Sequence, residues 1–121
     1  MNLKGKTVLV TAGPTRERID PVRYLSNFSS GKMGYAIAER ALLRGARVLL
    51  VTGPVAIAPP DGVQVIAIES ALDLLDAMQA HAPQADIVIQ AAAVADYRPA
   101  QVSGQKIKKK DGGAMTIELV E

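Results

Sequence analysis

With 121 residues, of which 49% are hydrophobic and 3% aromatic, the chain has enough apolar material for one domain with an aliphatic core, and too few rings to stack single-stranded nucleic acid. The absence of cysteine excludes disulfides, thiolate metal sites and thiol nucleophiles, and a net charge of +2 does not indicate a polyanionic partner. Met1 leads directly into charged residues, and no apolar stretch approaches the roughly 20 residues of a membrane span, so we expect a cytoplasmic protein.

The first predicted strand is an apolar, β-branched run at residues 7–11, which ends at Ala12-Gly13-Pro14, where a sharp turn is expected. Residues 13–29 follow, with two prolines, four charges between Arg16 and Asp20, and no helical period. We expect a long ordered loop there. Loops of this length in compact domains are usually functional, so this loop is a candidate site.

A helix is expected to begin at Ser29-Ser30-Gly31, because a serine side chain supplies an N-cap acceptor, and to end at Arg44-Gly45. Its apolar side is predicted from a period of four residues, at Met33, Ile37 and Ala41. Several small residues should let this helix lie close to a sheet: Gly34, Ala36, Ala38 and Ala41.

Two further strands are expected at residues 47–52 and 63–68, followed by a second helix. The sequence from Ser70 to Asp73 matches a capping box, and Pro83 is expected to stop the helix. The predicted apolar side of this helix consists of Leu72, Leu75 and Met78, with Ala71 and Ala82. A fourth strand at residues 87–89 leads into a run of alanines. This order predicts an α/β fold, a Rossmann-like open parallel sheet with helices on both faces.

The C-terminal part of the chain has a different pattern. Segments 106–108 and 115–120 flank Asp111-Gly112-Gly113, which predicts a lysine-rich hairpin that projects from the sheet. Two explanations of its lysines remain open: a solvated, protected strand edge, or a mobile loop that closes over a triphosphate. The lysines concerned are Lys106, Lys108, Lys109 and Lys110.

Open parallel sheets bind ligands beyond the carboxyl ends of their strands, and two common nucleotide motifs are missing there. A dinucleotide site needs G-x-G-x-x-G after the first strand and an acidic residue after the second, but the sequence reads Ala12-Gly13-Pro14-Thr15 and Thr52-Gly53-Pro54. A P-loop ending at Gly31-Lys32 would need glycine in place of Ser26, and Ser or Thr in place of Met33. The sequence therefore argues against both a hydride-transfer domain and a Walker site.

The segment from Ser29 to Gly34 remains as a candidate anion site at a helix N-terminus. Unpaired backbone N–H groups and the helix dipole favour a phosphate there, and two serine hydroxyls add donors. The alternative is an ordinary N-cap with close glycine packing.

Other candidate residues also have two explanations each. Asn27 would donate its amide to a carbonyl oxygen during acyl transfer, or would only form a turn. Arg23 would bind a substrate phosphate, or would be a solvated surface residue. The small residues 91–95 would admit a flat base, with Asp96 on ribose hydroxyls or magnesium; alternatively they pack against a helix that Asp96 caps. His81, near a helix C-terminus, is assigned no chemistry.

Five segments occur in a specific order and spacing: Thr11-Ala-Gly-Pro-Thr-Arg16, Asp20-Pro-Val-Arg23-Tyr, Ser26-Asn27-Phe-Ser-Ser-Gly-Lys-Met-Gly34, Ala91-Ala-Ala-Val-Ala-Asp-Tyr97 and Lys106-Ile-Lys-Lys109. Together they closely resemble the bacterial phosphopantothenoylcysteine synthetase family, over essentially the whole chain. The resemblance implies a ligase of coenzyme A synthesis. In that reaction the phosphopantothenate carboxylate attacks the α-phosphate of CTP, and cysteine then displaces CMP from the acyl-cytidylate. Positioning and electrostatic stabilisation suit both stages.

The resemblance also implies roles for individual residues. Asn27 would contact the acyl group and act in catalysis with Lys106, while Arg23 and Ala93 would lie on the phosphopantothenate side. The implied nucleotide-binding residues are Gly13, Ser29, Gly31, Gln90, Ala91, Ala92, Asp96 and Lys106. CTP would be the co-substrate, and Mg²⁺ is expected on its phosphate oxygens, with no protein metal ligand assigned.

The family also implies partners. Its substrates are 4'-phosphopantothenate, cysteine and CTP, and in many bacteria the synthetase is the C-terminal half of a bifunctional protein with a flavin-dependent decarboxylase half. The family is typically dimeric, and the hairpin at 106–120 is a candidate dimerisation element. No nucleic acid and no membrane partner is expected.

The chain is shorter than the family domain, so residues 1–121 would be its N-terminal part. We expect that this chain alone folds and retains weak triphosphate binding but does not turn over, because a site at a topological switch point needs both halves of the sheet. Apolar surface should then be uncovered near Ile117, Leu119 and Val120. The alternative function is a non-catalytic nucleotide-binding or regulatory module on the same fold.

Overall fold

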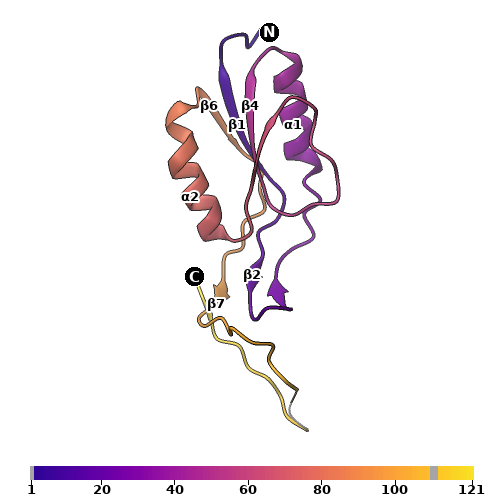
Figure 1. Ribbon diagram of the computed structural model, residues 1–121, viewed down its shortest axis with the longest axis vertical. Coiled ribbons are helices and arrows are strands. Elements are labelled where there is room, and N and C mark those ends of the chain that lie inside the picture. The colour runs from indigo at the N-terminus through magenta and orange to yellow at the C-terminus, as the bar shows by residue number, and fades with distance from the viewer. Residues whose placement is uncertain (1, 110–111) are drawn as a thin grey trace.

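Four parallel strands in the order β5-β4-β1-β6 form the central sheet of the computed structural model, which describes residues 2–109 and 112–121. The strands are β1 (Thr7–Ala12), β4 (Arg47–Thr52), β5 (Gln64–Ala67) and β6 (Ile87–Gln90). Helices α1 (Lys32–Leu43) and α2 (Ala71–His81) lie on opposite sides of the sheet (Figure 1). The predicted Rossmann-like sheet with helices on both faces is therefore confirmed.

The two central strands, β1 and β4, are buried on both faces and pair over their whole length, from Thr7 opposite Arg47 to Ala12 opposite Thr52. On one face a core cluster joins both strands to α1: Val8, Val10, Val48, Leu50, Tyr35, Ala38 and Ala41. On the other face Leu9, Leu49 and Val51 pack against Leu74 of α2. Burial on both faces explains why these strands are continuous apolar runs.

Helix α1 begins differently from the prediction. Its N-cap is Gly31, with φ of 79° and no side-chain cap bond, so the predicted serine N-cap is wrong; the Ser30 hydroxyl accepts only a 3.3 Å bond from the Lys32 amide. The predicted apolar side is partly right, because Ala41 is buried and Ile37 packs against the core, while Met33 is 72% exposed. The close approach is confirmed at Gly34, where an added Cβ would collide with the Ala12 side chain. The predicted end is also confirmed, with Arg44 as the C-cap.

Helix α2 has the predicted capping box. The Ser70 hydroxyl accepts from the Asp73 amide at 3.1 Å, and the Asp73 carboxylate accepts from the Ser70 amide at 3.0 Å. The predicted apolar side is only partly right, because Leu72 and Leu75 are about half exposed (52% and 51%) while Leu74 is buried. Only a narrow stripe, Leu74 with Ala77 and Met78, reaches the sheet. Pro83 lies in the short 3-10 helix η1 (Ala82–Gln84) that follows directly.

Residues 13–29 are more ordered than a loop. They contain an antiparallel pair, β2 (Glu17–Arg18) with β3 (Tyr24–Leu25), and the turn between these strands includes Asp20. Polar residues are buried along this segment: Thr15, Glu17 and Asp20 are 0%, 4% and 1% exposed. We call residues 13–31 the β1–α1 loop.

The C-terminal hairpin is confirmed in outline, and its second strand lies within the predicted segment 115–120, but its first strand lies before the predicted segment 106–108. Strand β7 (Arg98–Pro99) pairs antiparallel with β8 (Leu119–Val120), and the described residues between them, 100–109 and 112–118, extend from the sheet as an arm (Figure 1). We call residues 98–109 and 112–120 the arm. Described residues 106–108 and 115–118 are not in strands, since pairing is confined to the base of the arm. The predicted tip at Asp111, with Lys110, lies outside the described residues.

Within the described part of the chain, neither helix has the length and hydropathy that a bilayer span requires.

Candidate functional site

The carboxyl ends of β1 and β6 are joined through one buried hydroxyl. The Thr11 side chain is 0% exposed; its oxygen accepts bonds from the amides of Ala91 and Ala92, each at 3.1 Å, and donates to Gln90 Oε1 at 3.1 Å. Three predicted nucleotide-side residues, Gln90, Ala91 and Ala92, are therefore held in place by one threonine. The shape of this strand end does not depend on the alanines themselves, which have no polar side chain.

Glycine at position 13 is required by a positive φ of 76°, which brings three chain segments together. The Gly13 carbonyl accepts from the Ala93 amide at 2.8 Å. A Cβ at Gly13 would lie 2.9 Å from a methyl carbon of Val55 and 3.2 Å from the Gly53 carbonyl oxygen. The turns after β1, β4 and β6 thus meet at one point, as expected for the ligand edge of a parallel sheet.

Asn27 links the β1–α1 loop to this point. Its Nδ2 donates to the Ala93 carbonyl at 3.0 Å, and its Oδ1 accepts from the Ser29 amide at 3.0 Å. Nδ2 carries two hydrogens, and the Ala93 contact uses one of them. Asn27 is exposed, so the remaining N–H can point toward a ligand.

We call Gly13, Asn27, Ser29, Gly31 and Ala93 the strand-end cluster. A cavity of about 600 Å³ adjoins it, lined by residues from the β1–α1 loop, the start of α1 and the turn after β4. N-cap Gly31 has no side chain to cap α1, and Ser30 accepts only from the Lys32 amide at 3.3 Å, so the positive end of the helix dipole and the next N–H groups of the first turn lie beside this region. The arrangement suits a phosphate or carboxylate.

Asp96 lies apart from this cluster. It is exposed and lines a separate cavity of about 260 Å³ with Glu17, Tyr97 and Arg98, beside the start of α2. Ala92 packs on the same α2 side, against the core of Leu9 and Leu49. The predicted residues are thus divided between two sides of the sheet edge, with Asn27 and Ser29 on the α1 side and Asp96 on the α2 side.

Arg23 contacts the arm at Ile107. Its Nη1 pairs with the Asp20 carboxylate at 2.5 Å and donates to the Ile107 carbonyl at 3.2 Å. Arg23 also lines a cavity of about 520 Å³ with Lys108 and Lys109, which gives this cavity three cationic side chains. Lys106 is exposed one residue before Ile107.

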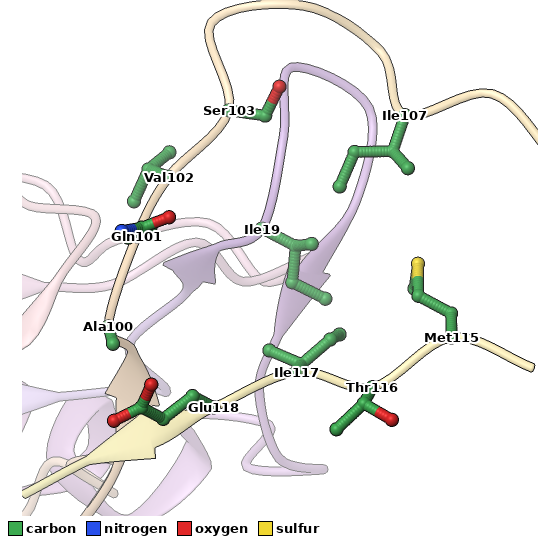
Figure 2. Close-up of a pocket in the computed structure, with 10 residues that line it drawn as sticks. All are labelled: Ile19, Ala100, Gln101, Val102, Ser103, Ile107, Met115, Thr116, Ile117 and Glu118. Atoms are coloured by element: carbon green, nitrogen blue, oxygen red, sulfur yellow. The ribbon is translucent and has the colours of Figure 1, made fainter.

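A second cavity of the arm, of about 630 Å³, is lined by both apolar and polar side chains. Figure 2 shows Ile19 of the β1–α1 loop between the two limbs of the arm, with Ile107 on one limb and Ile117 on the other. Uncovered apolar surface was predicted in this region, and Leu119 is 45% exposed.

Sequence reasoning missed the buried polar residues that hold these segments. Thr11 was assigned only to a strand and Thr15 to a motif, yet the Thr15 hydroxyl accepts from the Ala95 amide at 3.0 Å and its carbonyl accepts from the Ser26 hydroxyl at 2.7 Å. Asp20 was treated only as part of a motif. The signal available was an aspartate two and three residues before the amides it binds, a common turn-forming pattern.

Asp20 is ionised in the folded chain. Burial by itself would raise its pKa, but hydrogen bonds donated by the amides of Ile107, Val22 and Arg23 and by the Arg23 guanidinium lower that pKa to about 2. The Asp73 pKa is also lowered, chiefly by the Ser70 amide.

No group of three or more His, Cys, Asp or Glu side chains able to hold a metal ion occurs within residues 2–109 and 112–121.

A four-stranded parallel sheet with a ligand edge at its strand ends defines a Rossmann-like α/β binding domain. Residues 3–121 match the family described as the DNA/pantothenate metabolism flavoprotein C-terminal domain, and the chain belongs to this family. The resemblance stated from the sequence is thereby confirmed.

Several relatives are proteins called coenzyme A biosynthesis bifunctional protein CoaBC. Identity is 54% to the protein of Vibrio vulnificus strain YJ016 and 55% to that of Mycobacterium bovis, each over 120 residues and 98% of this chain. The chain spans only 30% and 29% of these two relatives. It therefore corresponds to part of a longer kind of protein.

Several solved structures have a similar fold. A crystal structure of the C-terminal domain of CoaBC has a TM-score of 0.83 at 53% identity, covering 98% of this chain and 54% of that one. The DNA/pantothenate metabolism flavoprotein from Streptococcus pneumoniae has a TM-score of 0.84 at 28% identity, with coverages of 97% and 60%. The fold also matches, at 18% identity and a TM-score of 0.77, a Cab2 structure in complex with phosphopantothenate-cysteine, covering 96% of this chain and 57% of that one.

Proposed function

We propose that the protein containing this chain is a phosphopantothenate–cysteine ligase that uses CTP. The observation that carries the proposal is the strand-end cluster, in which Asn27 bridges the Ala93 carbonyl and the Ser29 amide beside the uncapped start of α1. Membership of a family whose relatives are coenzyme A biosynthesis proteins supports the choice of substrates.

The proposed reaction has two stages. A carboxylate oxygen of 4'-phosphopantothenate forms a bond to the α-phosphorus of CTP and pyrophosphate leaves, giving an acyl-cytidylate. The amine of cysteine then bonds to the acyl carbon, a proton is lost, and CMP leaves as the amide forms. Negative charge develops on phosphoryl oxygens in the first stage and on the acyl oxygen in the second, so hydrogen-bond donors are the groups that lower both barriers.

The chain offers such donors. The second Nδ2 hydrogen of Asn27 would stabilise the acyl oxygen, and the α1 N-terminus with the Ser29 and Ser30 hydroxyls would hold a phosphate. Arg23 would bind the phosphopantothenate side, and Lys106 would neutralise the triphosphate. Asp96, on the α2 side, would accept from ribose hydroxyls.

Mg²⁺ would come with the nucleotide, where it would neutralise phosphate oxygens. The described residues do not form a metal cage, so no step is assigned to a protein-bound metal. Dimerisation through the arm, a flavin-dependent decarboxylase half in the same polypeptide, and a cytoplasmic location stay predictions from the family resemblance.

The test uses the natural full-length protein. Pyrophosphate release from CTP and phosphopantothenate, measured before cysteine is added, reports activation, and CMP release with the mass of the product after addition reports ligation. ATP and GTP are the control nucleotides. Calorimetric binding of CTP with no pyrophosphate release would instead support the alternative of a binding or regulatory module.

A further inference from the structure

We infer that Asp20 is a positioning residue, which holds the lysine-bearing limb of the arm against the loop that carries Arg23. The consequence for catalysis rests on the proposed function, because it requires Lys106 and Arg23 to bind the two anionic substrates. The positioning itself is a statement about this chain alone.

The two carboxylate oxygens of Asp20 accept hydrogen bonds from different parts of the chain. Oδ1 accepts from the backbone amides of Val22 and Arg23 at 2.9 and 2.8 Å, a turn within the loop. Oδ2 accepts from the Ile107 amide at 3.0 Å, 87 residues away, and from Arg23 Nη1 at 2.5 Å. One oxygen therefore forms the turn, and the other joins the turn to the arm.

Asp20 and Arg23 both bind the same residue of the arm, Ile107. Arg23 Nη1 also donates to the Ile107 carbonyl at 3.2 Å, so Asp20 and Arg23 hold both backbone polar groups of Ile107. The Ser103 amide adds a bond to the Ile19 carbonyl at 3.0 Å. Since Ile107 lies directly between Lys106 and Lys108, this clamp determines where both lysine side chains leave the backbone.

A carboxylate is needed at this position for two reasons. Asp20 is only 1% exposed and receives four donors, so a neutral group with a single acceptor atom would leave donors unpaired. It also orients the guanidinium through Nη1 alone, which leaves the other donors of Arg23 for a ligand. The side chain is thus built to connect two binding elements, beyond stabilising its own turn.

Asp20→Asn distinguishes these two roles. The amide oxygen can keep the turn with Val22 and Arg23, while the NH₂ group faces the Ile107 amide and the guanidinium, which are themselves donors. Glu17→Gln is the matched control, because Glu17 is another buried carboxylate of the same loop (4% exposed) whose bond goes to the Ala71 amide at 3.1 Å instead of the arm. A glutamine oxygen can still accept that single bond.

Both variants are made in the full-length protein and compared by hydrogen exchange and by steady-state kinetics. In Asp20→Asn we expect exchange at the Ile107 amide at least about tenfold faster, with β1 and β4 unchanged. We expect kcat/KM for pyrophosphate release to fall by about tenfold to a hundredfold, largely through KM for phosphopantothenate and CTP. Glu17→Gln should match the unaltered protein in exchange at the Ile107 amide, and this exchange is the readout for which it is the control, because Glu17 lines the cavity of Asp96.

Two results would overturn the inference: Asp20→Asn behaving like Glu17→Gln at Ile107, or protection being lost throughout β1 and β4, which would indicate a general folding role. If the unaltered protein releases no pyrophosphate, the proposed function fails, and the exchange comparison still decides whether Asp20 positions the arm.

Discussion

The sheet with its two helices and the β1–α1 loop with the arm are held together by different forces. In the body, Leu9, Leu49 and Leu50 are 0% exposed and aliphatic packing covers both faces of β1 and β4. The loop, and the arm at Ile107, are instead held by a few hydrogen bonds to buried polar residues such as Thr15 and Asp20. Apolar packing is distributed over many contacts, whereas each of these hydrogen bonds depends on one atom pair. Substitutions in the loop or the arm should therefore displace the site while the sheet and its helices stay folded.

The largest expected effect comes from breaking the body. Leu49→Ala removes a side chain that is 0% exposed between Leu9 and Leu74, so unfolding should become easier by about 2–5 kcal/mol. Leu75→Ala is the control, since Leu75 is 51% exposed and should change stability by less than about 0.5 kcal/mol. Urea denaturation followed by circular dichroism measures both. Equal losses would mean that the assigned core is wrong.

Removing one cation of the arm should leave the stability of the sheet and helices unchanged and lower only the rate of the reaction. Lys106→Ala is expected to raise the activation barrier by about 2–4 kcal/mol, because a charge contact to the triphosphate is lost in the transition state. The rate of pyrophosphate release at saturating CTP measures it. Lys6→Ala, an exposed lysine just before the amino end of β1, should have no effect. An unchanged rate in Lys106→Ala would show that the lysines are only a solvated edge.

A smaller and stage-specific effect is expected at the strand-end cluster. Asn27→Asp replaces a donor by a carboxylate, which repels the charge on the acyl oxygen and also faces the Ala93 carbonyl without a hydrogen to share. The barrier for transfer to cysteine should rise by about 1–3 kcal/mol more than the barrier for activation. Single-turnover assays of pyrophosphate release and of ligation separate the stages. The same loss in both would contradict the assignment, and Asn27→Ser tests whether a smaller donor restores transfer.

The smallest effect is a dependence of stability on acid. The Asp20 pKa is about 2 in the folded chain against an ordinary 3.8, so its contribution to stability is complete above about pH 4 and is lost as the pH falls toward 2. The lowered pKa of Asp73 acts in the same direction. Asp20→Asn should therefore lose less stability over this interval than the unaltered chain. Denaturation midpoints at several pH values measure the slopes, and identical slopes would show that Asp20 is not held as a carboxylate.

Solution studies can also test the prediction that this chain alone folds without turnover. Its β6 strand leaves Ile87 and Val88 at 39% and 42% exposed, and the arm leaves Leu119 at 45%. We expect normal circular dichroism, concentration-dependent elution from a sizing column, and no pyrophosphate release. Turnover near 1 per second, on the order of an ordinary enzyme, would show that residues 1–121 contain a complete site.

The sequence by itself determined the body, because burial on both faces demands continuous apolar runs at 7–12 and 47–52, and because a capping box and a terminal glycine are local signals. It also determined the family, through five segments in order, and with it the candidate residues Asn27 and Lys106.

Only the tertiary structure decided which of these residues meet. On α1 the predicted Ala41 packs against the sheet while Met33 is exposed, and on α2 Leu74 packs against the sheet in place of Leu72 and Leu75. The link from Asp20 to Ile107 spans 87 residues, and no local pattern in either segment specifies it. Hydrogen bonds between segments far apart in sequence depend on how the backbone is placed by the packed core, so they become visible only once the chain has folded.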